Sequence, residues 1–522
     1  MTQDPNGAQA LIRTLVDSGV DVCFTNPGTS EMHFVAALDD VPEMRGILGL
    51  FEGVVTAAAD GYARMAGRPA ATLLHLGPGL GNGLANLHNA RRARTPVVNI
   101  VGDHATYHKR YDAPLESDID SIAKGAGGWF RRSMSPDRVA ADTADAVAAA
   151  MGPPGQVATL VLPADTCWLP APGGAAAPVA PPAPASADPA DVDRVAKLLA
   201  SDAQCTILVG GRAVDEAGTR AAARIAEATG AKLLCETFPS RQRRGAGIPS
   251  LEKVIYLAEF AEMQFAGTEH LILVDTVAPV SFFAYPEKPS TLWPEGCDIV
   301  TLADGAIDPV SSLEALAELV GGDPAAGPEL NPGERPSGPL DAMSMAAAVA
   351  ATLPENAIVA DESNTAGIGL TGATAGCAPH DWLCLTGGSI GIGLPLAVGA
   401  AVAAPDRRVV ALQADGSAMY TYQALWTMAR EALDITTVIL NNGRYAVLDM
   451  ELARVGADAG GPIARSMFDL SSPDLDFVNM AAGLGVEGVR VETAEDLTAQ
   501  LERAHATPGP QLIEAIVPPL EV

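Results

Sequence analysis

The sequence is poor in basic residues and has no cysteine pairs spaced for a metal. It contains 33 Lys and Arg against 63 Asp and Glu, a net charge of −30, which repels phosphate backbones and anionic membrane surfaces. We therefore expect no nucleic acid and no membrane partner. Its seven cysteines include no Cys-x-x-Cys pair, so neither a zinc site nor a disulfide framework is indicated.

Long hydrophobic runs are also absent. No apolar stretch reaches the length of a membrane span, and residues 1–7 lack the basic start and apolar stretch of a signal peptide. We therefore expect a cytoplasmic protein. Hydrophobic residues make up 48% of the chain and charged residues 18%, which is enough to bury large cores. At 522 residues, the chain is expected to form several domains.

Two segments rich in Pro, Gly and Ala interrupt the chain. They span residues 170–193 and 321–341 and have the composition of linkers. We therefore expect three domains, over residues 1–170, 190–322 and 340–522.

Within each block, short apolar runs alternate with alanine-rich helical patterns. Examples of the runs are residues 22–26, 96–102, 270–275, 407–415 and 435–442. Strands buried on both faces and separated by helices form parallel sheets. The predicted fold class is therefore α/β, with three doubly wound parallel-sheet domains.

Polar residues follow two of these runs in the last block. Asp415, Gly416 and Ser417 follow the first, and the second ends at Asn441 and Asn442. Parallel α/β sheets bind ligands at the carboxyl ends of their strands, and carboxylate and amide oxygens suit Mg²⁺. Each motif alone is an ordinary turn sequence. Together they indicate a magnesium and phosphate site.

This segment resembles the diphosphate-binding signature of thiamine-diphosphate enzymes, which begins GDG and ends NN. The resemblance implies that Asp415 and Asn442 bind Mg²⁺ through their side chains and Arg444 through its backbone carbonyl. Two glycines of the signature are replaced, by Ala414 and by Ala446. The further residues implied at the cofactor are Gly416, Ser417, Asn364, Thr365, Tyr445, Ala446 and Val447.

A second segment, GLFEGVVTAAADGYARMAG (residues 49–67), is similar to the family segment that begins with Glu and ends ADGYAR. The resemblance implies that Glu52 hydrogen-bonds the aminopyrimidine ring and assists removal of the C2 proton. The alternative is an ordinary first-turn glutamate favoured by the helix dipole. In TGGSIGIGLP (residues 386–395), Ile390 matches the residue that bends the cofactor, and Gly388 matches the carbonyl that binds the pyrimidine.

The segment FTNPGTSEMHF (residues 24–34) looks like the NPG turn of the decarboxylases. The resemblance places Asn26, Pro27 and Gly28 at the cofactor and Thr29 where relatives have a substrate-binding serine. His75 stands where those enzymes carry an active-site histidine, although a lone histidine can also be structural. His104 is a weaker candidate, and Asp103 replaces a glutamine that many relatives have.

The resemblance is greatest to the acetolactate synthase large-subunit and benzoylformate decarboxylase branch. It implies a thiamine-diphosphate- and Mg²⁺-dependent lyase or transferase, a decarboxylase or carboligase that attacks small 2-oxo acids through the C2 ylid. Its active sites are expected at the subunit interface of a homodimer or homotetramer.

Residues 274–283 lack the flavin-contacting pattern of typical acetolactate synthases, and residues 443–456 lack their tryptophan, so FAD is not expected. The second histidine of benzoylformate decarboxylases falls near Ala284. Two alternatives remain: a true acetolactate synthase, and a non-catalytic cofactor-binding or regulatory relative. Retention of Glu52, Asp415 and Asn442 argues against the latter.

Overall fold

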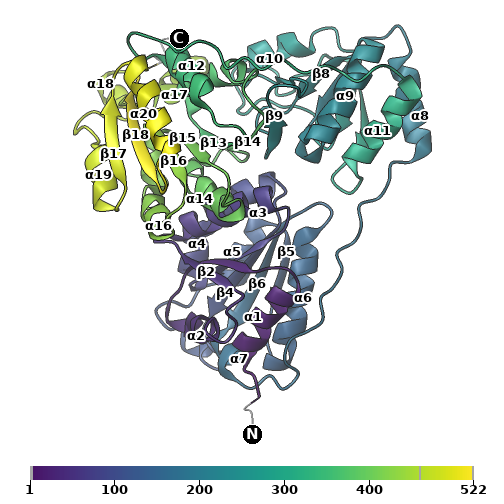
Figure 1. Cartoon of the computed structure of the whole chain (residues 1–522). Helices are drawn as coiled ribbons and strands as arrows, with labels where there is room; N and C mark the ends of the chain where they lie inside the picture. The colour runs from purple at the N-terminus through teal and green to yellow at the C-terminus, as the bar shows by residue number, and fades with distance from the viewer. Residues whose placement is uncertain (1–3, 458–459, 520–522) are drawn as a thin grey trace.

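The computed structural model describes residues 4–457 and 460–519 and contains three β-sheets with flanking helices (Figure 1). In the first domain, six parallel strands lie in the order β2-β1-β3-β4-β6-β5. Its elements are α1 (Gly7–Asp17), β1 (Val22–Asn26), α2 (Met32–Ala37), β2 (Arg45–Leu48), α3 (Glu52–Ala66), β3 (Ala70–Leu74), α4 (Leu76–Arg92), β4 (Val97–Asp103), α5 (Ile119–Ala126), β5 (Trp129–Arg132), α6 (Pro136–Met151), β6 (Val157–Pro163) and α7 (Ala164–Trp168).

The central domain has a smaller sheet, of five parallel strands in the order β10-β8-β7-β11-β12. The segment that leads to it from the first domain is extended along most of its length (Figure 1). The elements of the central domain are α8 (Pro189–Leu199), β7 (Cys205–Val209), α9 (Glu216–Thr229), β8 (Lys232–Cys235), β10 (Glu252–Lys253), α10 (Ala258–Phe265), β11 (His270–Val274), β12 (Asp298–Ala303) and α11 (Pro309–Val320).

Seven strands form the third sheet, in the order β17-β18-β16-β15-β13-β14-β9. The third domain comprises α12 (Ala342–Thr352), β13 (Ile358–Glu362), α13 (Leu370–Ala373), β14 (His380–Cys384), α14 (Gly393–Ala403), β15 (Val409–Ala414), α15 (Asp415–Thr421), α16 (Ala424–Arg430), β16 (Ile435–Asn441), α17 (Ala446–Arg454), α18 (Pro462–Ser466), α19 (Phe477–Gly483), β17 (Glu487–Val491), α20 (Ala494–Ala506) and β18 (Gln511–Ile516). In each domain the strand order reverses at one point, since β1 lies between β2 and β3, β7 between β8 and β11, and β13 between β14 and β15. The predicted doubly wound α/β class is confirmed.

Two details differ from the sequence-based expectation. Helix α8 begins at Pro189, inside the predicted linker 170–193, because Asp188 caps it and proline suits the first helical position. In addition, β9 (Gln242–Arg244) leaves the central segment and pairs with β14 of the third sheet in the antiparallel direction. The third sheet is therefore mixed, with one edge strand supplied from elsewhere in the chain.

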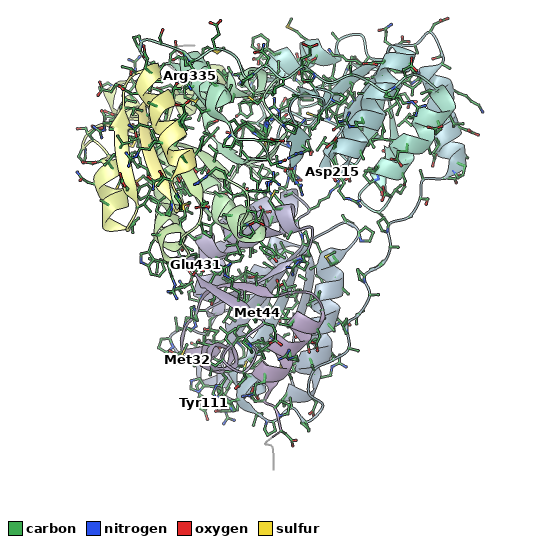
Figure 2. All side chains as sticks on the ribbon, viewed as in Figure 1. Met32, Met44, Tyr111, Asp215, Arg335 and Glu431 are labelled. Atoms are coloured by element: carbon green, nitrogen blue, oxygen red, sulfur yellow. The ribbon has the colours of Figure 1, made fainter. Side chains whose placement is uncertain are left out.

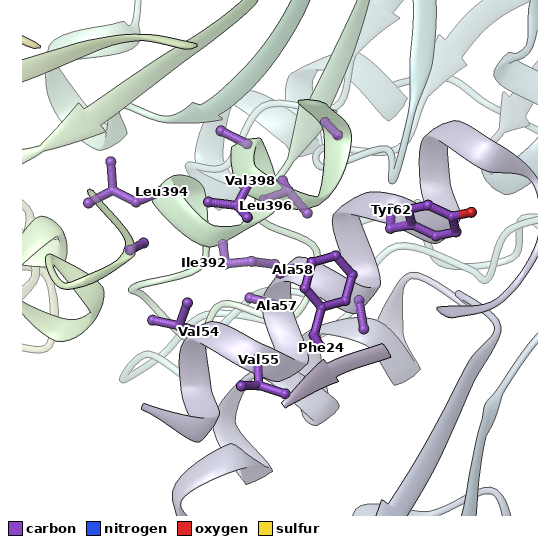
Figure 3. Close-up of a cluster of buried hydrophobic side chains, with 14 of the residues drawn as sticks. Phe24, Val54, Val55, Ala57, Ala58, Tyr62, Ile392, Leu394, Leu396 and Val398 are labelled. Carbon is purple, nitrogen blue, oxygen red and sulfur yellow. The ribbon is translucent and has the colours of Figure 1, made fainter. Parts of the chain in front are cut away.

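Helices α3 and α14 join the first domain to the third. Val54, Ala57, Ala58 and Tyr62 of α3 share one buried cluster with Ile392 and with Leu394, Leu396 and Val398 of α14 (Figure 3). Small residues let the helices approach closely, since a Cβ atom on Gly399 would lie 1.9 Å from the Ala58 carbonyl oxygen. This contact fixes where the sheet of the first domain lies relative to the third.

Among residues 4–457 and 460–519, no helix combines the length and the apolar character that crossing a membrane requires.

Candidate active site

The predicted residues of the first domain gather at one edge of its sheet. Asn26 ends β1, and Glu52 and His75 follow β2 and β3. His104 comes directly after β4. These strands are parallel neighbours, and the chain changes its direction of travel across the sheet between β1 and β3. Such a switch point is where α/β sheets bind ligands.

Glu52 is a buried carboxylate with one oxygen that accepts no hydrogen bond among the described residues. Only 7% of the residue is exposed, and its Oε2 accepts a hydrogen bond from Nδ2 of Asn82 on α4 at 3.0 Å. A Cβ atom on Gly79 would lie 3.2 Å from the other oxygen, Oε1, so a larger residue there would press against the carboxylate. Asn86 donates to the Gly53 carbonyl at 2.9 Å and holds α4 against the start of α3. The carboxylate can therefore accept a second donor from a ligand ring.

His75 is oriented by Glu31, which is also buried. The Nδ1 atom of His75 lies 2.8 Å from Oε2 of Glu31 and 3.2 Å from Oγ of Ser30. The same carboxylate oxygen accepts the Gly28 N–H at 2.8 Å. A Cβ atom on Gly28 would lie 2.3 Å from the imidazole, so only glycine fits here. Because Glu31 holds Nδ1, proton transfer to a ligand is left to Nε2.

Thr29 and His104 lie at the same sheet edge. Thr29 is exposed at the start of a short 3₁₀ helix (Thr29–Glu31). The buried Nε2 atom of His104 has no hydrogen-bond partner among the described residues, and its ring centroid lies 5.4 Å from that of His108. An unpartnered ring nitrogen at a ligand-binding edge is a candidate contact for a substrate.

Asp103, the residue in place of the family glutamine, does not face open space. It is fully buried and accepts hydrogen bonds from Lys109 at 3.0 Å and from Arg132. Its charge is therefore neutralised within the first domain.

In the third domain, the structure brings Asp415, after β15, against the turn that contains Asn442, after β16. Oδ2 of Asp415 accepts the N–H groups of Asn442 at 3.1 Å and Gly443 at 2.8 Å, and Oδ1 accepts that of Gly416 at 2.7 Å. Oδ1 of Asn442 accepts the Arg444 N–H at 2.9 Å. Burial raises the pKa of Asp415, and the backbone hydrogen bonds act to lower it.

These oxygen atoms fit a magnesium ion that also takes phosphate oxygens, since Mg²⁺ in proteins is held by few side chains. Within the described ranges, there is no group of three His, Cys, Asp or Glu residues that could hold a metal by itself. A metal at this turn would therefore need the amide of Asn442, a backbone carbonyl and ligand oxygens beside Asp415.

The residues around this turn pack closely. A Cβ atom on Gly416 would lie 2.3 Å from the Tyr445 ring, which explains the glycine. The hydroxyl of Ser417 donates to the Ala414 carbonyl at 3.1 Å. A cavity of about 840 Å³ opens beside Asn442, and its other lining residues are Gly443, Arg444, Asp449, Leu452, Ala453, Pro462, Arg465, Ser466, Asp469 and Ser471. Ala446 and Val447 begin α17 next to it.

The loop over residues 387–393 lies at the carboxyl end of β14. Gly388 is exposed with a φ of 75°, and Ile390 is half-buried against the cluster between α3 and α14. Asn364, with a φ of 51°, and Thr365 follow β13 at the same sheet edge. The predicted residues of the third domain therefore also share one edge.

Within one chain, hydrogen bonds from α4 link the two groups of residues. Asn86 donates to the Gly53 carbonyl at 2.9 Å, next to Glu52, and Nδ2 of Asn89 lies 2.9 Å from Oδ1 of Asn86 and 2.8 Å from the Ser389 carbonyl. Helix α4 therefore holds both the start of α3 and the loop over residues 387–393.

The site contains polar residues that sequence reasoning did not single out. Glu31, Asn82 and Glu362 hold His75, Glu52 and the 387–393 loop, respectively. Glu31 lies within FTNPGTSEMHF, and Glu362 stands two residues before Asn364. The available signal was an acidic residue next to a strand end.

A nucleotide cofactor in the central domain would be expected at its own switch point, between β7 and β11. There the N–H groups of Gly211 and Arg212 donate to Glu236 at 2.9 Å and to Asp275 at 2.8 Å. Protein carboxylates thus occupy the amides that a phosphate would need. These residues do not fit the diphosphate of FAD.

Comparison with known proteins gives two family matches. Residues 5–123 match the model described as "Thiamine pyrophosphate enzyme, N-terminal TPP binding domain". Residues 368–515 match "Thiamine pyrophosphate enzyme, C-terminal TPP binding domain". The matches include all the site residues of the first domain and, in the third domain, those from Gly388 onward.

Similar proteins match over nearly the whole chain. A Mycobacterium tuberculosis protein named "Putative acetolactate synthase large subunit IlvX" is 58% identical over 99% of both chains. Benzoylformate decarboxylase of Pseudomonas aeruginosa is 30% identical, over 95% of this chain and 96% of that protein. The structure of a Rhodococcus jostii thiamine diphosphate-dependent 4-hydroxybenzoylformate decarboxylase matches with a TM-score of 0.85 and 25% identity, over 99% of this chain and 100% of that one.

Proposed function

This chain belongs to the thiamine pyrophosphate enzyme family, and we propose that it is a decarboxylase or carboligase of 2-oxo acids that uses thiamine diphosphate and Mg²⁺. The observation that carries the proposal is Glu52, buried at the carboxyl edge of its sheet with one oxygen that accepts no hydrogen bond among the described residues. When bound, thiamine diphosphate supplies a carbon nucleophile for the 2-oxo group. Glu52 would hold a proton at ring nitrogen N1′, and Nε2 of His75 would exchange a proton with the substrate.

In the third domain, Asp415, Asn442 and the Arg444 carbonyl would hold the metal, with Gly416 and Ser417 at the diphosphate. Asp415→Ala is expected to weaken thiamine diphosphate binding at least tenfold, because the metal loses its only carboxylate. Fluorescence titration with and without Mg²⁺ measures this. Asp474→Ala, which removes an exposed carboxylate of the third domain, is the control. Equal affinity in wild type and Asp415→Ala would place the metal elsewhere.

A complete site requires two chains in this proposal. The family resemblance implies that the glutamate and the diphosphate motif of one site come from different chains. Large apolar side chains near both edges are exposed, among them Leu50 (45%) and Tyr420 (53%), as are Met32 and Tyr111 on the surface of the first domain (Figure 2). We expect activity in sedimentation fractions that hold a homodimer or homotetramer. A fully active monomer would contradict the proposal.

The identity of the substrate distinguishes the two enzyme activities that remain possible. The relative at 58% identity is named for acetolactate synthesis, and two others are named for decarboxylation of benzoylformate or its 4-hydroxy derivative. A panel of pyruvate, 2-oxobutyrate and benzoylformate, scored for CO₂ and for ligated product, decides between a true acetolactate synthase and a decarboxylase. We propose that neither reaction requires FAD, since Glu236 and Asp275 occupy the amides at the central switch point.

A non-catalytic role is the second candidate. It would require thiamine diphosphate to bind without exchange of its C2 proton. Exchange in the wild-type protein therefore separates an enzyme of unknown substrate from a cofactor-binding or regulatory relative.

A further inference from the structure

Glu362, the last residue of β13, is buried at the switch point of the third sheet, where β13 and β15 lie side by side. We propose that Glu362 is a positioning residue that fixes the 387–393 loop and thereby the side chain of Ile390. The role in positioning a cofactor rests on the proposed function. The contacts that fix the loop are present in the protein chain by itself.

The Glu362 carboxylate joins the loop to the sheet. Oε1 accepts the N–H of Gly391 at 2.6 Å, and Oε2 accepts the N–H of Gly393 at 2.6 Å. Nε2 of Gln413, on β15, donates to Oε2 at 3.0 Å. All three partners are uncharged donors, so the ionised carboxylate is the form that satisfies them. Gly393 also begins α14, where an anion is favoured by the helix dipole.

Further hydrogen bonds hold the loop on both sides of Ile390. Asn89 of the first domain donates through Nδ2 to the Ser389 carbonyl at 2.8 Å, and its Oδ1 accepts the Ser389 N–H at 3.3 Å. Thr421 donates to the Gly391 carbonyl at 2.8 Å. Ile390 therefore lies between two backbone segments that are each hydrogen-bonded to a fixed element.

Steric constraints keep the loop in this path. Gly391 has a φ of 95°, and a Cβ atom there would lie 2.5 Å from Cβ of Tyr420. A Cβ atom on Gly393 would lie 2.3 Å from Oε1 of Gln413. The backbone therefore approaches Glu362 only because both positions are glycine.

Gln413 links Glu362 to the residues proposed to bind the diphosphate. Nε2 of Gln413 also donates to Oγ of Ser417 at 2.5 Å. Glu362 and Gln413 thus connect the loop with Ile390 to the turn with Asp415 and Ser417. A shift of the loop would disturb the pyrimidine before the diphosphate, since the turn keeps its own backbone hydrogen bonds.

The test is Glu362→Gln, which keeps the shape but turns an N–H group toward one of the two backbone donors. In the cofactor-free protein, exchange of backbone amide hydrogens in peptides covering residues 386–394 should become about ten- to a hundredfold faster, since hydrogen bonds to charged groups contribute about 1.5–3 kcal/mol. In the protein with cofactor, we expect thiamine diphosphate affinity to change less than threefold and C2 proton exchange to slow by about tenfold.

Glu236→Gln is the matched control, because Glu236 is a carboxyl at a strand end that also accepts a glycine N–H. Its variant should alter neither the 386–394 peptides nor C2 exchange. If Glu362→Gln does not fold, Thr421→Val loosens the loop from its carbonyl side and gives the same readouts. Unchanged amide exchange would show that Glu362 does not fix the loop. Unchanged C2 exchange with a loosened loop overturns the positioning role. Failure of wild type to bind thiamine diphosphate would instead refute the proposed function.

Discussion

Glu52→Gln is expected to slow exchange of the C2 proton of bound thiamine diphosphate by about 10² to 10⁴, the range for loss of a positioned acid–base group. Glutamine keeps the shape and can still accept the hydrogen bond from Asn82. An amide cannot share a proton with N1′, so removal of the C2 proton loses its assistance. Binding should persist, because the metal and diphosphate residues lie in the third domain. Acid quench in deuterated buffer followed by NMR measures the exchange.

Glu431→Gln is a suitable control for this experiment. Glu431 pairs with Arg45 at 2.8 Å where the first and third domains meet, and Arg45 begins β2 at the end opposite Glu52. The control should exchange at the wild-type rate. If Glu52→Gln does so too, Glu52 is not the activating carboxylate and the first-domain assignment is wrong.

Strand positions were largely predictable from the sequence. The runs at residues 22–26, 96–102, 270–275, 407–415 and 435–442 match β1, β4, β11, β15 and β16 to within one or two residues. These strands are buried on both faces and thus consist of apolar runs. The strand order then brings the polar residues at their ends together. This is why the sequence could predict that Asp415 and Asn442 lie close to each other.

Contacts between distant segments were not predictable in this way. Strand β9 contains Gln242, Arg243 and Arg244, with no apolar pattern, and becomes a strand only because β14 offers an open edge. The sequence pattern pointed to Asn364 and Thr365 but not to Glu362. The hydrogen-bond partners of Glu362 lie in a loop and a strand elsewhere in the sequence, so no local pattern reveals them. The roles of Thr29, His75 and His104 stay predictions, as do those of Glu52, Asp415 and Asn442.

The second large effect is expected on the stability of the protein and concerns the attachment of β9 to β14. Asp381 on β14 is buried and accepts hydrogen bonds from three guanidinium groups: Arg241 at 2.8 Å, Arg243 at 3.2 Å and Arg407 at 2.6 Å. Arg241 also donates to the Arg64 carbonyl of α3 at 3.1 Å. Arg241 therefore connects the central segment to both the third domain, through Asp381, and the first domain, through Arg64.

Asp381→Ala is expected to destabilise the protein by about 3–5 kcal/mol, because it leaves partly buried guanidinium groups without their anion. For a unit of 150–250 residues this corresponds to a fall of roughly 6–20 °C in the thermal midpoint. Differential scanning calorimetry of the full chain measures it. Asp191→Ala is the control, since its pair with Arg194 is about half exposed on both sides and should contribute at most about 1 kcal/mol.

The difference between wild type and Asp381→Ala should also depend on pH. Burial acts to raise the pKa of Asp381, but the arginines outweigh it and hold the pKa below the ordinary value of 3.8. A carboxyl with a lowered pKa in the folded state stabilises the fold above the unfolded pKa and loses this effect as the pH falls through the folded one. The gap in thermal midpoint should thus be constant near neutral pH and shrink below pH 3.8. A gap that grows on acidification, or is absent at pH 7, would show that Asp381 does not anchor β9.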